Sequence, residues 1–260
     1  MYIEETGTPG APTILFLHGA GIAGWMWQAQ MDEFKDFHCL APDLPGHGRS
    51  SMDEWISLAD TADKLAEVIR TRATGNRANI VGLSLGGYIG LHLLARHSEL
   101  LERAVLSGVT IAPLPNPKLT LLQFWLMSFL VKNSFLIKKN AQMMNLPDKY
   151  FETYAQSVRA MSRQAFWRVV REVTLFHTPE AVRNSSIPTL VVGGEREAEL
   201  VKLAIPKLAA MMPCARGYLA PRVGHGWNGE VPDLFNRMLR AWFGNTPMPK
   251  ELIVAQQFPK

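Results

Sequence analysis

Val-Gly-Leu-Ser-Leu-Gly-Gly-Tyr, residues 81–88, places one serine between two leucines and surrounds it with three glycines. The apolar run 78–83 before the serine is typical of a strand, and the amphipathic stretch 85–96 after it is typical of a helix. A G-x-S-x-G pattern on such a strand–turn–helix unit lifts the serine hydroxyl into solvent at the edge of a sheet. We therefore predict that Ser84 is a nucleophile, although the pattern alone would also fit a glycine-rich turn with an unused serine.

Short apolar runs alternate with helical stretches along much of the chain. The runs that indicate strands are 13–17, 38–42, 78–83, 103–107, 189–192 and 217–220. Amphipathic spacing predicts helices over 58–72, 85–96 and 233–243. This alternation predicts an α/β fold with a mostly parallel, doubly wound sheet and helices on both faces. In such sheets the functional loops lie at the carboxyl ends of the strands.

One segment interrupts the alternation. Residues 111–183 contain no clear strand and are rich in Phe, Trp, Leu and Met. We expect a helical cap there, inserted after the sixth strand, with residues 1–110 and 184–260 forming the core domain. The last residues, 245–260, contain three prolines and are expected to form a surface tail.

A serine hydroxyl needs a base to accept its proton, and imidazole is suited to this at neutral pH. His225 is the best placed of seven histidines, because it lies just beyond the last expected strand. His18 and His47 also follow strands, but each occupies a loop that looks structural. We predict that His225 is the base.

A third group should orient the base and stabilise its charged form. The run 189–192 leads into a segment with three glutamates and no aspartate, namely Glu195, Glu197 and Glu199. A carboxylate on the outer face of a helix would only be solvated, so one of the three at most has this role. We favour Glu197 over Glu195.

Ester hydrolysis also needs donors for the developing oxyanion, typically preset backbone N–H groups. The amide of Leu85 is one expected donor, and that of Ala20, in the loop after the first apolar run, is the other. The expected substrate pocket includes Trp25, with Phe124, Trp125 and Phe129 as its roof. These aromatic side chains fit the internal core of the cap equally well.

The bulk composition excludes several classes of protein. The net charge is +4 and the sequence pI about 9.1, but no long Lys/Arg run indicates nucleic-acid binding. Residues 111–180 carry the positive excess, with nine Lys/Arg and four Asp/Glu.

Cys39 and Cys214 lack the spacing of a metal site and are expected as two buried free thiols. No signal peptide or spanning segment is recognisable, so we expect a cytoplasmic protein without stable membrane insertion.

With these residues in place, the chain resembles the α/β-hydrolase family over essentially its whole length. Four landmarks carry the resemblance: His18-Gly19, the loop Asp43–Ser50, the serine motif, and Gly224-His225. The resemblance implies the order serine, acid, histidine, which fits Ser84, Glu197 and His225, with no metal or cofactor. It also implies a structural role for Asp43–Ser50. The departure is glutamate at 197, where the family commonly has aspartate.

The resemblance implies a serine hydrolase that cleaves a small or medium apolar carboxylic ester through an acyl-enzyme on Ser84. Carbon–carbon bond hydrolases, lyases and perhydrolases share this scaffold, because a fold does not fix a function. A hydrolase-like protein that binds a ligand without turnover is a further alternative. The basic cap suggests a substrate with a carboxylate, and a solvated surface explains it equally well. The oligomeric state stays open.

Overall fold

The structure is a computed structural model that describes residues 1–143 and 146–255. Its centre is an eight-stranded sheet with the order β1-β3-β2-β4-β5-β6-β7-β8. The strands are β1 (Ile3–Gly7), β2 (Thr13–Leu17), β3 (His38–Pro42), β4 (Ala78–Leu83), β5 (Leu101–Ser107), β6 (Thr189–Gly194), β7 (Ala215–Ala220) and β8 (Ile253–Val254). β3 to β7 run parallel with β2, whereas β1 pairs antiparallel with β3 and β8 antiparallel with β7.

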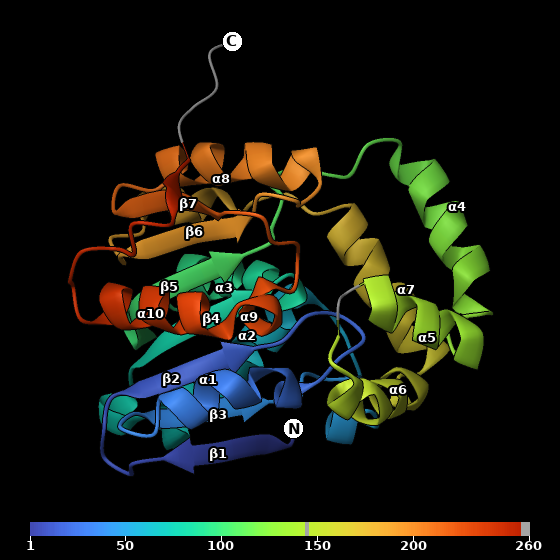
Figure 1. Cartoon of the computed structure of the whole chain (residues 1–260), viewed down its shortest axis with the longest axis horizontal. Coiled ribbons are helices and arrows are strands. Elements are labelled where there is room, and N and C mark those ends of the chain that lie inside the picture. Colours follow the sequence, from blue (N-terminus) through green and yellow to red (C-terminus); the bar gives the residue numbers. More distant parts are fainter. Residues whose placement is uncertain (144–145, 256–260) are drawn as a thin grey trace.

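Helices cover both faces of the sheet, as Figure 1 shows. Side chains alternate between faces along a strand. On β2, Ile14 and Phe16 join the apolar cluster under α1 (Gln28–Glu33) and α10 (Pro232–Phe243). Leu15 and Leu17 join the cluster under α2 (Leu58–Arg72), α3 (Leu85–Arg96) and α8 (Glu199–Met211). The predicted α/β, doubly wound fold is confirmed.

The sequence reasoning missed both edge strands. Residues 245–260 were expected as a surface tail, but Leu219 and Tyr218 of β7 pair with Ile253 and Val254. Residues 256–260 of that expected tail lie outside the described residues. The first strand, β1, pairs along its whole length with β3. Five strands therefore precede the helical insertion in this chain, and the expected position after a sixth strand is wrong.

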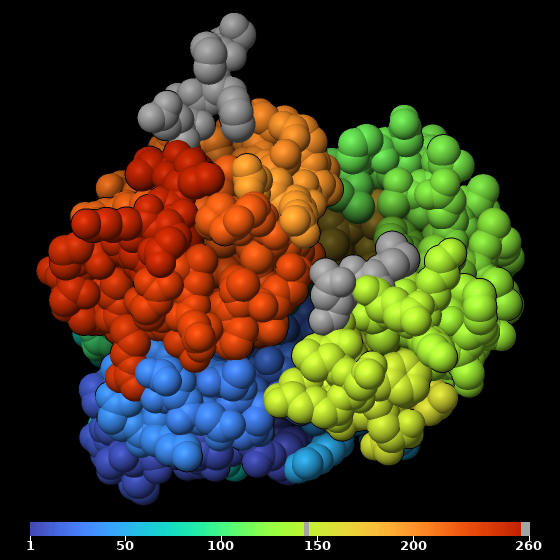
Figure 2. Space-filling model, viewed as in Figure 1, coloured from blue at the N-terminus to red at the C-terminus, as the bar shows by residue number. Residues whose placement is uncertain are grey.

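The segment between β5 and β6 is helical. It contains α4 (Pro117–Ser128), α5 (Ser134–Met143), α6 (Phe151–Ala160) and α7 (Arg163–Thr174). These helices lie beyond the carboxyl ends of the parallel strands in Figure 1. Figure 2 shows a hollow between this green and yellow-green segment and the orange part of the chain. Shorter helical pieces are α9 (Trp227–Glu230) and 3₁₀ turns at Gly24–Trp27, Gly48–Ser50, Thr74–Asn76, Ser98–Leu100, Asp148–Tyr150 and Glu180–Asn184.

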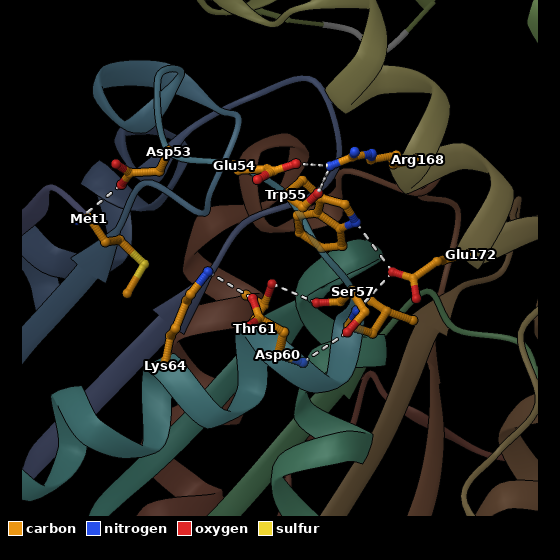
Figure 3. A network of polar contacts seen from close by, with 11 residues as sticks. Met1, Asp53, Glu54, Trp55, Ser57, Asp60, Thr61, Lys64, Arg168 and Glu172 are labelled. Carbon is orange, nitrogen blue, oxygen red and sulfur yellow. Dashed lines mark hydrogen bonds and ion pairs between the residues drawn. The ribbon is translucent and has the colours of Figure 1, made fainter.

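Polar contacts hold α7 against the start of α2 (Figure 3). The Glu172 carboxylate accepts hydrogen bonds from the indole N–H of Trp55 at 3.2 Å and from the backbone N–H of Leu58 at 2.8 Å. Arg168 donates to the carbonyl of Trp55 at 2.8 Å and forms an ion pair with Glu54. Leu58 is the first residue of α2, so Glu172 also places its negative charge at a helix N-terminus. One face of α7 is thereby fixed to the sheet-and-helix body.

Both cysteines are free thiols. Cys39 is buried on β3, as expected, whereas Cys214 is exposed. The expected burial of Cys214 is wrong because the residue lies in the turn between α8 and β7. Among the described residues, no helix is long and apolar enough to cross a membrane.

Candidate active site

Ser84 occupies the turn between β4 and α3. Its backbone has φ 54° and ψ −114°, a conformation that an L-residue rarely adopts. The backbone N–H of Ser84 donates to the carbonyl of Ser107 on the neighbouring strand at 2.8 Å. The side chain is half-buried at the carboxyl edge of the sheet. A strained residue held this firmly is typical of a functional position.

The three glycines around Ser84 are explained by close packing. A Cβ on Gly86 would lie 2.1 Å from the carbonyl oxygen of Leu17, and one on Gly82 would lie 2.3 Å from the carbonyl oxygen of Gly86. A Cβ on Gly87 would lie 2.5 Å from Val109 Cγ1. No side chain fits at any of these contacts, so α3 can start directly against β2 and β4 only because the motif lacks side chains there.

His225 and Glu197 come together at the same sheet edge. His225 follows β7 and Glu197 follows β6, and His225 Nδ1 lies 2.8 Å from Glu197 Oε2. The imidazole is 48% exposed, whereas the carboxylate is only 3% exposed. Partial burial lowers the pKa of His225, but the hydrogen bond to Glu197 and its negative charge outweigh this, so the net pKa is raised. Glu197 therefore fixes the imidazole with Nδ1 turned inward.

The other two candidate glutamates lie elsewhere. Glu195 is exposed and accepts a hydrogen bond from the backbone N–H of Arg222 at 2.8 Å. Glu199 lies in the first turn of α8 and pairs with Lys202 at 2.8 Å. Of the three, the structure brings only Glu197 to His225. The second oxygen of Glu197 is buried without a hydrogen-bond partner among the described residues.

His18 and His47 have structural surroundings, as expected from their loops. The backbone N–H of Leu44 donates to His18 Nε2 at 2.9 Å, and His18 Nδ1 lies 2.8 Å from the carbonyl oxygen of Gly19. Burial lowers the pKa of His18 to about 4 and that of His47 to about 3. Both imidazoles are therefore neutral at pH 7. Asp43 accepts from two backbone N–H groups, which holds the 43–50 loop in place.

The two residues expected to supply oxyanion donors, Leu85 and Ala20, lie directly after Ser84 and in the turn after β2. Leu85 is the first residue of α3, where backbone N–H groups have no partner within the helix. Ala20 is exposed in the turn after β2. Its neighbour Gly19 lies beside the nucleophile, because a Cβ there would be 3.6 Å from Ser84 Cβ. The turn after β2 therefore adjoins the serine on one side and α3 on the other.

Two of the four expected pocket residues, Trp25 and Trp125, line cavities that do not include Ser84 or His225. Trp25 donates to Ser157 Oγ at 2.9 Å and lines a cavity of about 390 Å³ beside α6. Trp125 lines a cavity of about 400 Å³ between α4 and α7. Phe129 is exposed and packs under the guanidinium of Arg163, whereas Phe124 is half-buried on α4. Their role as a pocket roof stays a prediction.

Sequence reasoning missed Gly108, directly after β5. It has φ 69°, and a Cβ there would lie 2.6 Å from His225 Cε1 and 3.2 Å from Glu197 Oε1. The preceding residue, Ser107, accepts from the indole N–H of Trp227 at 3.1 Å. A glycine immediately after a predicted strand was the available signal. Gly108 forms the wall against which the imidazole and carboxylate lie.

The sequence profile of the alpha/beta hydrolase family matches residues 14–238. The chain belongs to this family. Over 257 residues it is 24% identical to an AB hydrolase superfamily protein of Gibberella zeae, covering 94% of this chain and 84% of that one. Among the described residues, no group of three or more His, Cys, Asp or Glu side chains could hold a metal ion.

Other similarities are more local or structural. A pimeloyl-(acyl-carrier protein) methyl ester esterase of Nitrosomonas europaea is 32% identical over 111 residues, which are 42% of this chain and 41% of that protein. The enol-lactonase of Burkholderia xenovorans superposes with a TM-score of 0.79 at 20% identity, covering 94% of this chain and 96% of that one. At this identity the superposition supports the fold alone. These two proteins are named for ester and lactone substrates, and the second shares the architecture of this chain.

Proposed function

We propose that this chain is a serine hydrolase that cleaves a small or medium apolar carboxylic ester through an acyl-enzyme on Ser84. The observation that carries the proposal is the 2.8 Å contact between His225 Nδ1 and Glu197, on loops at the sheet edge where Ser84 lies. The name of the similar methyl ester esterase supports the same class of bond. Residues 111–183 would act as the cap over the core of residues 1–110 and 184–260.

In the first half of the reaction, Ser84 Oγ attacks the carbonyl carbon while its proton passes to His225 Nε2. The resulting imidazolium is stabilised by Glu197. The backbone N–H groups of Ala20 and Leu85 donate to the oxyanion. The tetrahedral intermediate collapses, the C–O bond to the alcohol breaks, and the alcohol oxygen takes the proton from His225.

In the second half, water enters beside the acyl-enzyme. His225 Nε2 accepts a proton from the water as its oxygen attacks the acyl carbon. The bond to Ser84 Oγ then breaks, and Oγ recovers the proton from His225. The products are one carboxylic acid and one alcohol, and the enzyme returns to its starting state.

The raised pKa of His225 affects the pH range of this reaction. The imidazole must be neutral to accept a proton, so activity is lost as the pH falls through a pKa above 6.5. Exposure of nearly half of this side chain leaves it accessible to substrate and water. The substrate class is set by whatever the cap and the loop after β2 admit.

The test is hydrolysis of p-nitrophenyl esters from acetate to laurate by the wild type, Ser84→Ala and Ser51→Ala. Ser51 is a matched control, because it is half-buried like Ser84 and its hydroxyl makes no hydrogen bond among the described residues. We expect kcat/KM to fall by about 10⁴-fold or more in Ser84→Ala and to stay unchanged in Ser51→Ala. A fluorophosphonate probe should label the wild type and the control at one serine, and should not label Ser84→Ala.

Retained turnover in Ser84→Ala would overturn the acyl-enzyme proposal. Turnover by no variant on any ester would overturn the esterase proposal and favour lyase or carbon–carbon bond chemistry. Ester binding without turnover, unchanged by Ser84→Ala, would assign a ligand-binding role.

A further inference from the structure

Helix α4 and the residues after it carry most of the exposed large apolar side chains of the helical segment. We name as the α4 patch Leu119, Leu122, Leu126 and Leu130, whose exposed fractions lie between 52% and 55%. The spacing of Leu119, Leu122 and Leu126 places them on one face of the helix. Within α4, only Ser128 is buried. An apolar patch of this kind marks a contact surface.

The opposite face of α4 already has a partner. The patch lies away from that side, because Thr120, Leu121 and Phe124 are half-buried where α4 packs beside α7. Figure 2 shows α4, in green, as an outer lobe at the side of the molecule. The helix is apolar on both faces, with one face packed and the other open. Packing within this chain therefore does not explain the residues of the patch.

The charged residues of the chain segment that carries the α4 patch have one sign. Lys118, Lys132, Lys138 and Lys139 are exposed, and none forms an ion pair within the part of the chain that the structure describes. The sequence has no Asp or Glu from residue 103 to residue 147. Arg163 adds a further positive charge, with its guanidinium 3.8 Å from the ring centre of Phe129. The chain segment that carries the α4 patch thus has several positive charges and no negative one.

We propose that the α4 patch docks this protein on the surface of an anionic lipid bilayer. The leucine side chains would enter the boundary between headgroups and acyl chains, and the lysines would meet the lipid phosphates. With 12 residues, α4 is too short to span a bilayer, so the contact is peripheral.

Charge also argues against a second copy of this chain as the occupant. A two-fold dimer would place the same patch on both subunits face to face. Lys118 and Lys132 of one copy would then approach the corresponding lysines of the other, with no acidic side chain between residues 103 and 147 to compensate. An anionic lipid surface supplies the missing negative charge.

The test is co-sedimentation with vesicles of phosphatidylglycerol and phosphatidylcholine in equal parts, compared with pure phosphatidylcholine vesicles. The wild type should partition at least tenfold more strongly into the anionic vesicles. The double variant Leu122→Ser/Leu126→Ser should lose this binding at least tenfold. Ile56→Ser is the matched control, because Ile56 is 56% exposed in the loop before α2, close to the 54% of Leu126.

Two further variants test whether the lysines and the nucleophile contribute to vesicle binding. Lys132→Gln/Lys138→Gln/Lys139→Gln should abolish the preference for anionic vesicles. Ser84→Ala should bind like the wild type, because docking does not involve the nucleophile. An unchanged melting temperature of the α4 double variant shows that it is folded.

The proposal is overturned if the wild type sediments with neither vesicle, or if the folded α4 double variant sediments like the wild type. It is also overturned if sedimentation equilibrium shows a dimer that the double variant dissociates. In that case the patch is an interface between copies of this chain.

Discussion

Helices α10 and α4 are both 12 residues long and both begin with a proline, yet they bury very different surfaces. α10 buries Phe235, Asn236, Met238, Leu239, Ala241 and Trp242, whereas α4 buries only Ser128. In α10 the apolar residues recur with the period of a helix and face the sheet. In α4 they surround the helix. Apolar residues stabilise a fold only where the fold covers them, and α4 has more of them than its neighbours cover.

The largest expected effect compares one leucine from each helix. Leu239 is fully buried, and Leu126 is 54% exposed. Leu239→Ala should lower the free energy of unfolding by about 2–5 kcal/mol, because it leaves a cavity under the sheet. Leu126→Ala should change it by less than about 0.5 kcal/mol.

Urea denaturation of the two variants and the wild type gives both values. Equal losses in the free energy of unfolding of the two variants would show that α4 is as firmly packed in solution as α10.

The second prediction concerns the contact between the two regions, at Glu172. Glu172→Leu should cost about 1–3 kcal/mol, because the N–H groups of Trp55 and Leu58 would lose their acceptor. Glu172→Gln keeps an acceptor oxygen and removes the charge, so its melting temperature at pH 7 should equal or exceed that of the wild type. Calorimetry of both variants measures the effect.

The pH dependence of the Glu172 contact has a defined sign. Burial raises the pKa of Glu172 above 4.5, against the hydrogen bonds from Leu58 and Trp55. Protonation therefore stabilises the folded state below about pH 4.5, and this contribution is lost as the pH rises through the raised pKa. Glu172→Gln should lack this dependence, and an identical pH–stability curve for the two proteins would contradict the assignment.

The third prediction concerns Ser84, whose strained backbone lowers the stability of the folded protein. Ser84 holds a φ of 54°, which glycine adopts without strain. Ser84→Gly should raise the free energy of unfolding by about 1 kcal/mol while abolishing turnover. Ser84→Ala keeps the strain and should leave stability close to that of the wild type. A destabilised glycine variant in urea denaturation would contradict this account.

The smallest expected effect is a change in the pKa of His225. The pKa of His225 is raised above 6.5, whereas burial lowers that of His18 to about 4. Glu197→Gln should lower the pKa of His225 and leave His18 uncharged above pH 5. Because the pKa of His225 is raised in the folded state, protonation of His225 contributes stability below pH 6.5. This contribution is lost as the pH rises through the raised pKa. NMR titration of the imidazole Cε1–H signals follows both residues. An unchanged pKa of His225 in Glu197→Gln would show that Glu197 does not raise the pKa of this imidazole.

Sequence patterns predicted the central elements because each buries a strongly periodic or continuous apolar face. Strands over 13–17, 38–42 and 78–83 and helices over 58–72 and 85–96 have the predicted limits. The edge strand β1, Ile-Glu-Glu-Thr-Gly, carries no such pattern, because its conformation comes from pairing with β3. The sequence favoured Glu197 over Glu195, but the 2.8 Å contact with His225 could be seen only in the fold, because the path of the chain decides which carboxylate reaches the imidazole.

Gly108 has a consequence for saturation mutagenesis. Any other residue at this position places a Cβ 2.6 Å from His225 Cε1, on a backbone with φ 69°. A library of all substitutions, screened for turnover, should therefore reject every replacement of Gly108 about as strictly as replacements of Ser84. In such a screen, intolerance at Ser84 identifies a reactive group, whereas intolerance at Gly108 identifies a space that must stay empty.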